Sequence, residues 1–87
     1  MGIEYTILVP DADHAAVSVA LKDRLGPLLQ ALDPTQNGSH PHISVTEIQG
    51  GVYVCDHLSD RTVASRVIRE LIDLLLSHSV RVTIVEL

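Results

Sequence analysis

Two histidines, a serine and the only cysteine of this 87-residue chain occupy alternate positions of two neighbouring segments, 42–48 and 52–57. Imidazole and thiolate groups are ligands that zinc prefers, and a cysteine beside a histidine can act as an activated nucleophile. A single cysteine excludes an internal disulfide and a cysteine-rich zinc module. No carboxylate except that of Glu4 is expected near these side chains to orient an imidazole. The residues concerned are His42, Ser44, Cys55 and His57.

We therefore interpret these residues as part of a polar binding surface that has no catalytic residue and needs no cofactor. A small metal-binding protein or enzyme that uses His42, Cys55 and His57 is an alternative, and no metal is assigned. A second cluster, Asp11, Asp13 and His14, could attract a cation at a helix start. Capping of a following helix explains its two acidic residues without any ligand.

Strands must position the first group of residues, because β-branched side chains are frequent in both segments. Residues 3–9 and 80–87 have the same character and predict two further strands. Gly50-Gly51 lies between the two central segments and indicates a hairpin turn, since tight turns need a positive φ that glycine adopts freely. A turn at this dipeptide places Ser44 opposite His57 and Thr46 opposite Cys55.

Two other segments have the periodicity of amphipathic helices. In the first, Gly26-Pro27 interrupts an apolar stripe that stays in phase, which predicts one kinked helix or two short coaxial helices. Asp11 or Asp13 is expected to cap this helix, and Ser59 or Asp60 to cap the second. The apolar stripes are formed by Val17, Leu21, Leu25, Leu28 and Leu32 in the first helix and by Val63, Val67, Leu71 and Leu74 in the second.

The order strand, helix, strand, strand, helix, strand predicts a single ferredoxin-like α+β domain over residues 1–87. Such a βαββαβ sandwich has a four-stranded antiparallel sheet, in the spatial order 4-1-3-2, with both helices on one face. Side-chain alternation directs Ile43, Val45, Val52 and Val54 towards the helices, and likewise Val80, Val82 and Ile84 of the last strand. The opposite, open face is predicted to be the binding surface, which consists of His42, Ser44, Thr46, Tyr53, Cys55, His57 and Arg81.

Composition excludes several classes of partner. Six basic and eleven acidic residues give a net charge of −5, which disfavours nucleic acids and anionic membranes. RNA-recognition domains of this topology stack bases on several aromatic residues, whereas only Tyr53 is expected on the central open face. Acylphosphatases share the strand order but need an arginine in the loop after the first strand, and none is present there. The sequence has neither a membrane-spanning apolar run nor the beginning of a signal peptide, so we expect a cytoplasmic protein.

These exclusions favour a small, acidic protein-interaction module that is not an enzyme. We expect it to bind another protein through the open sheet face or an edge strand. An immunity-type inhibitor of a cognate bacterial toxin with a basic domain is the specific case, because acidic groups attract a basic partner. Residues 80–87 form a long β-prone segment without proline, and such an edge predicts a homodimer.

The segment from Val9 to Leu21 resembles the first turn of ACT domains, which are regulatory amino-acid sensors of similar size and topology. In both, an acidic residue ends the first strand and is followed by a small residue and an aliphatic helix face. The glycine usually found at this turn is absent here. The resemblance implies an alternative function as a dimeric small-ligand sensor, with an amino acid bound at the interface near the first turn.

Overall fold

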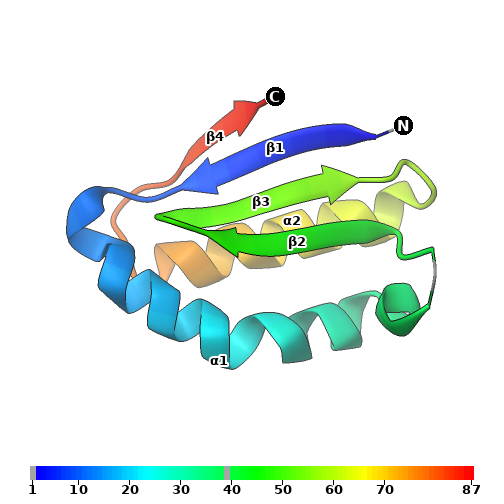
Figure 1. The fold of residues 1–87 in the computed structure, drawn as a ribbon, viewed down its shortest axis with the longest axis horizontal. Helices are drawn as coiled ribbons and strands as arrows, with labels where there is room; N and C mark the ends of the chain where they lie inside the picture. The colour runs from blue at the N-terminus through cyan, green and yellow to red at the C-terminus, as the bar shows by residue number, and fades with distance from the viewer. Residues whose placement is uncertain (1, 39) are drawn as a thin grey trace.

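The computed structural model describes residues 2–38 and 40–87, which fold as a sheet covered on one face by two helices (Figure 1). The strands form one antiparallel sheet in the order β2-β3-β1-β4. This order and the βαββαβ sequence of elements confirm the ferredoxin-like α+β fold. The elements are β1 (Ile3–Leu8), η1 (Asp11–Asp13), α1 (His14–Leu32), η2 (Pro34–Asn37), β2 (Ile43–Ile48), β3 (Gly51–Asp56), α2 (Arg61–Leu76) and β4 (Thr83–Glu86), where η marks a short 3-10 helix.

The core lies between the sheet and the helices and is built from aliphatic side chains. Ile43, Val52 and Val54 are completely buried in it, and Val45 packs against its margin. The predicted alternation of the hairpin is therefore confirmed. The helices contribute the stripes that the sequence predicted, including the fully or almost fully buried residues Val17, Leu21, Val67 and Leu71.

The hairpin turn lies one residue earlier than predicted. Ile48 pairs with Gly51, so the turn consists of Gln49 and Gly50, and Gly50 has a φ of 83°. Gly51 is instead the first residue of β3, where a Cβ atom would clash with the carbonyl oxygen of Ile7 in β1. The glycine is needed for a close approach between strands, a long-range requirement that the local turn pattern does not reveal.

This correction changes the cross-strand partners but not the faces. Ser44 pairs with Cys55, and Thr46 pairs with Tyr53, in place of the predicted His57 and Cys55. Moving the turn by one residue shifts the register by two, which returns every side chain to its predicted face.

Pro27 lies inside α1, which continues through it as one helix of 19 residues. The preceding residue, Gly26, has no Cβ atom to collide with the proline ring, so the backbone can stay helical there. The predicted cap by Asp11 or Asp13 is wrong. Asp13 occupies the N-cap position without a capping hydrogen bond, and η1 precedes the helix.

The second helix begins as the sequence predicts. The Asp60 carboxylate accepts hydrogen bonds from the backbone N–H groups of Thr62, at 3.0 Å, and Val63, at 3.1 Å. These two donors have no partner within the helix, so the side chain satisfies them.

β4 is shorter than the predicted strand over residues 80–87, and the predicted inward position of Val80 is wrong, since this side chain is 92% exposed. The Ser79 hydroxyl donates to the Asp13 carboxylate at 2.7 Å and also lies 3.0 Å from the Arg81 carbonyl oxygen. These contacts hold the chain in a turn until just before the strand begins. Figure 1 shows the helices beside and behind β2 and β3, with no helix behind β4.

Asp33 connects the end of α1 to the start of β2 and is completely buried. Its carboxylate accepts hydrogen bonds from the Thr35 side chain and backbone, from the Gln36 amide at 3.0 Å and from the His42 N–H at 2.9 Å. Burial alone would raise the pKa of Asp33, but these hydrogen bonds outweigh it and hold the pKa below its ordinary value.

Candidate functional site: the open face of the sheet

The open face is the side of the sheet that the helices leave uncovered, and the strand register arranges its side chains in three rows. The polar row contains Ser44, Cys55, Glu4 and Leu87. The central row contains Thr46, Tyr53, Thr6 and Val85. The apolar row contains Ile48, Gly51, Leu8 and Thr83.

Four of the predicted binding residues, Ser44, Thr46, Tyr53 and Cys55, thus lie on one continuous surface. His42 and His57 flank it just beyond the ends of β2 and β3, where the His57 N–H donates to the His42 carbonyl at 3.2 Å. Tyr53 belongs to the central row and lies on β3, one of the two central strands. The only aromatic side chain of these rows is therefore near the middle of the open face.

His57 connects to two side chains of the polar row. Its Nε2 atom lies 2.7 Å from the Ser44 hydroxyl oxygen, and its Nδ1 atom lies 3.9 Å from the Cys55 sulfur. In principle, a hydroxyl beside an imidazole can act as a nucleophile, with the imidazole as its general base. Here the second ring nitrogen faces a thiol and not the carboxylate that would orient the ring in such a site. The arrangement is a fixed polar patch with donors and acceptors at its surface.

The Tyr53 hydroxyl donates a hydrogen bond to the Glu4 carboxylate on β1. This bond stabilises the protonated phenol, and together with partial desolvation and the charge of Glu4 it raises the pKa of Tyr53 to about 12. Glu4 therefore orients the tyrosine at the centre of the face and not an imidazole.

His42 contacts Ser59, with 2.6 Å between its Nδ1 atom and the hydroxyl oxygen. His40, His42 and His57 line a hollow of about 390 Å³ at this end of the sheet. Within residues 2–38 and 40–87, no three histidine, cysteine or acidic side chains are arranged to hold a metal ion. The structure therefore offers no support for the alternative metal site of His42, Cys55 and His57.

Arg81 does not join the other predicted residues. It is exposed in the turn before β4, and the contacts of Ser79 hold its backbone there. β1 and β4 separate this turn from the hairpin strands that carry the polar side chains.

In the first turn of the chain, where the ACT-like alternative places a ligand, the polar side chains contact other protein groups, and a hollow of about 230 Å³ lies beside His14. The His14 ring donates from Nε2 to the Val9 carbonyl at 3.1 Å, and the Asp11 carboxylate lies 3.5 Å from the same nitrogen. Asp13 accepts from Ser79. Asp13 thus holds the segment before β4 in place, whereas the Asp11 side chain is fully exposed.

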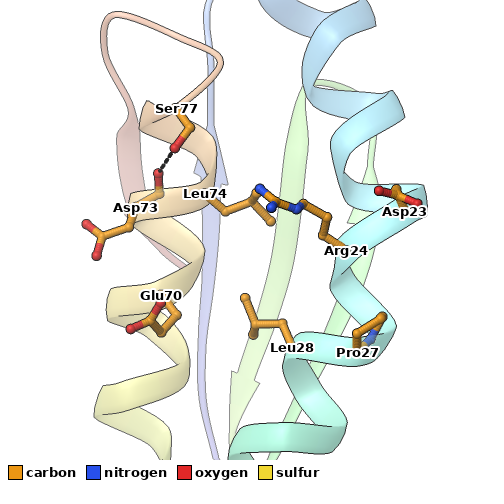
Figure 2. A pocket seen from close by; sticks show the side chains of 8 residues that line it. All are labelled: Asp23, Arg24, Pro27, Leu28, Glu70, Asp73, Leu74 and Ser77. Carbon is orange, nitrogen blue, oxygen red and sulfur yellow. Dashed lines mark hydrogen bonds between the residues drawn. The ribbon is translucent and has the colours of Figure 1, made fainter.

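A groove of about 530 Å³ lies on the other side of the molecule, between α1 and α2. Figure 2 shows Leu28 and Leu74 pointing towards the space between the helices, with Arg24 reaching across from α1 and the Asp73 carboxylate directed away. None of the predicted binding residues lines this groove.

Sequence reasoning missed three partners of the site. Glu4 was recognised as a nearby acid but not as the acceptor for Tyr53, and nothing local connects Ser59 to His42 or Ser79 to Asp13. The strand register would have found the first pair, because Tyr53 pairs with Thr6 and Glu4 lies two residues from Thr6 on the same face. The other two pairs join loops and have no periodic signal.

Comparisons with known proteins give no relative: no family model matches the chain, and neither the curated proteins nor the solved structures include a significant match. In the described parts of the chain, 2–38 and 40–87, neither helix combines the length and apolar character required to cross a membrane.

Proposed function

We propose that this protein is a non-enzymatic interaction module that recognises another protein with the open face of its sheet. The observation that carries the proposal is the position of Tyr53 near the middle of an uncovered sheet face, held by Glu4. Tyrosine is enriched at the centre of protein interfaces because it combines a large apolar ring with a hydrogen-bonding hydroxyl and loses little conformational entropy.

The surroundings of Tyr53 support binding to a protein surface. On one side, Leu8 and Ile48 flank Gly51, which has no side chain, so the apolar row contains a shallow gap between two aliphatic groups. On the other side, Ser44 and His57 provide a polar rim that is already hydrogen-bonded. A central aromatic ring with an apolar row on one side and a preorganised polar row on the other resembles the general anatomy of protein interfaces.

The charge of the chain favours a basic partner. A net charge of −5 attracts a basic surface during diffusion, which increases the association rate at low ionic strength. An immunity-type inhibitor of a basic toxin domain is the specific case that we propose, acting in the cytoplasm, where the thiol of Cys55 stays reduced. A stoichiometric loss of the toxin's activity on mixing would support this case, and full activity in the complex would contradict it.

The test compares three forms of the protein as bait in the cell extract of its source organism. The wild type and the control Val19→Lys, altered on the exposed side of α1, should retain one stoichiometric partner, whereas Tyr53→Ala should lose it. With the purified partner, Tyr53→Ala should weaken the Kd by about tenfold or more, as expected for a central interface residue. Retention by Tyr53→Ala together with loss by Val19→Lys would place the interface on the helices and overturn the proposal.

A further inference from the structure

β4 is an edge strand with a single neighbour, β1. The Leu87 N–H donates to the Glu4 carbonyl at 2.8 Å, which fixes the direction of the backbone groups along the strand. In an antiparallel pair these groups point alternately towards and away from the neighbour. Those that point away from β1, and could pair with a further strand, belong to Val82, Ile84 and Glu86.

Apart from Thr83 and Glu86, the side chains of this edge are apolar on both of its faces. Ile84, on the helix side, is 49% exposed, and Val85, on the open side, is 42% exposed. Leu87 and Val80 are exposed as well, and the strand contains neither proline nor lysine. Natural edge strands usually carry such protective residues, because an exposed apolar edge invites pairing with another chain.

The opposite edge of the sheet, β2, is protected. Glu47 lies on the helix side of this strand, where the Ser18 hydroxyl donates to its carboxylate at 2.8 Å and the Lys22 ammonium lies 3.5 Å away. A charged residue directed inwards from an edge strand opposes the docking of another strand, because docking would desolvate it. Glu86 of β4 is also on the helix side, but it is exposed and no helix lies behind β4 (Figure 1), so pairing need not desolvate it. Of the two edges, β4 is therefore the one open to pairing.

We infer that β4 pairs in antiparallel orientation with β4 of a second copy of this chain, about a two-fold axis at Ile84, so that the two sheets become continuous. The outward backbone groups restrict the register, because paired residues must both point towards the interface. With Ile84 on the axis, Val82 faces Glu86 of the partner subunit, and Thr83 faces Val85 of the partner subunit. This inference goes beyond the proposed function and does not depend on it.

Charge complementarity selects this register. It places Arg81 of the partner subunit, in the turn two residues before its β4, beside Leu87 and across Leu87 from Glu4 on the open face. The separation is two strand spacings, about 10 Å between backbones, which the arginine and glutamate side chains can span together. An axis at Thr83 would instead place Arg81 of the partner subunit opposite Val85 and beside Thr6, which carries no charge.

The first experiment measures the mass of the full chain in solution by sedimentation equilibrium, from about 5 to about 200 µM. The wild type should be a dimer whose dissociation constant rises at least about tenfold in Ile84→Lys and in Arg81→Glu. The charge-exchanged double variant Arg81→Glu/Glu4→Arg should return to within about threefold of the wild type. The matched control Val19→Lys, on exposed α1, should dimerise normally.

The second experiment tests the register by disulfide formation in the Cys55→Ser background. A mixture of Thr83→Cys chains and Val85→Cys chains should give a cross-linked mixed dimer, because these positions face each other in a closely spaced pair. Thr83→Cys alone should remain uncross-linked. Cross-linking of Thr83→Cys alone would move the axis to Thr83 and overturn the register.

A wild-type monomer over the whole concentration range, or a dimer that Ile84→Lys leaves intact, would overturn the inference as a whole. Circular dichroism of each variant identifies loss of folding. If Ile84→Lys does not fold, the cross-linking experiment still tests the inference, because its cysteine substitutions are conservative changes at exposed positions. The partner of the open face is tested separately with Tyr53→Ala, which leaves every β4 contact in place.

Discussion

Asp33 is a buried carboxylate whose charge is stabilised by donors from η2 and from the residues at the start of β2. The backbone N–H of Ile43 also lies within 3.3 Å of it. Because the pKa of Asp33 is lower in the folded protein than its ordinary value of 3.8, the ionised form stabilises the fold above that pH. This stabilisation is lost as the pH falls through the lower, folded pKa.

We expect Asp33→Asn to lower the free energy of unfolding at pH 7 by about 1 to 3 kcal/mol, because asparagine has one acceptor oxygen where aspartate has two, and its amide nitrogen only donates. The difference from the wild type should shrink as the pH falls below 3.8, where the unfolded aspartate becomes protonated. Urea denaturation followed by circular dichroism at several pH values measures both effects. Asp23→Asn, at an exposed position of α1, is the control, and an equal loss in both variants would contradict the role of Asp33.

The pKa of Tyr53 reports directly on the central contact of the open face. The Glu4 carboxylate raises the pKa of Tyr53 to about 12 through its hydrogen bond to the phenol. Glu4→Gln should bring this pKa down towards the ordinary value of 10.0, because the neutral amide no longer favours the protonated phenol. Ultraviolet titration in a Tyr5→Phe background isolates the Tyr53 signal. Glu70→Gln on α2 should leave the titration unchanged, and an equal shift in that variant would contradict the assignment.

The elements show where local patterns are sufficient. The alternation of Ile43 and Val45 with polar neighbours determined the faces of the hairpin correctly, because one misplaced residue would have exposed the whole apolar set. The same sequence could not fix the partners of Ser44 and Thr46. Two adjacent glycines suit a turn equally well, and the distinction rests on the contact of Gly51 with β1, which is remote in sequence.

Within α1, we expect Pro27 to lower the free energy of unfolding of the protein. Its ring nitrogen cannot donate to the carbonyl of Asp23, one turn earlier, and the residue is exposed and not needed for the core. Pro27→Ala should therefore increase the free energy of unfolding, by up to about 3 kcal/mol. Pro34→Ala is the matched control in urea denaturation, because proline fits the start of η2 without losing a bond. A less stable Pro27→Ala would show that the proline is needed.

The whole molecule is asymmetric across its sheet. The order of elements was sufficient to predict the ferredoxin-like topology, since few arrangements satisfy right-handed crossovers and short connections. The exposed position of β4 could not be predicted in this way. It depends on where the two helices pack against the sheet and on the loop contact between Ser79 and Asp13. Neither of these features has a periodic pattern in the sequence.

The two binding surfaces proposed above lie on different parts of the molecule, and a two-fold pairing through β4 would align two open faces. Each face keeps its own Tyr53, so a dimer would present two equivalent sites to one large partner or to two small ones. Simultaneous engagement of both sites would strengthen binding without any new contact, provided that the geometry of the partner allows it.

The single neighbour of β4 also affects how the protein opens. Detaching this strand breaks the pairing with β1 while β1, β2 and β3 remain joined, so it requires less free energy than global unfolding. The hairpin strands β2 and β3 keep their pairing during such an event, because β1 lies between them and β4. The last strand can thus unpair from β1 and pair with it again by local unfolding, while the rest of the structure stays folded.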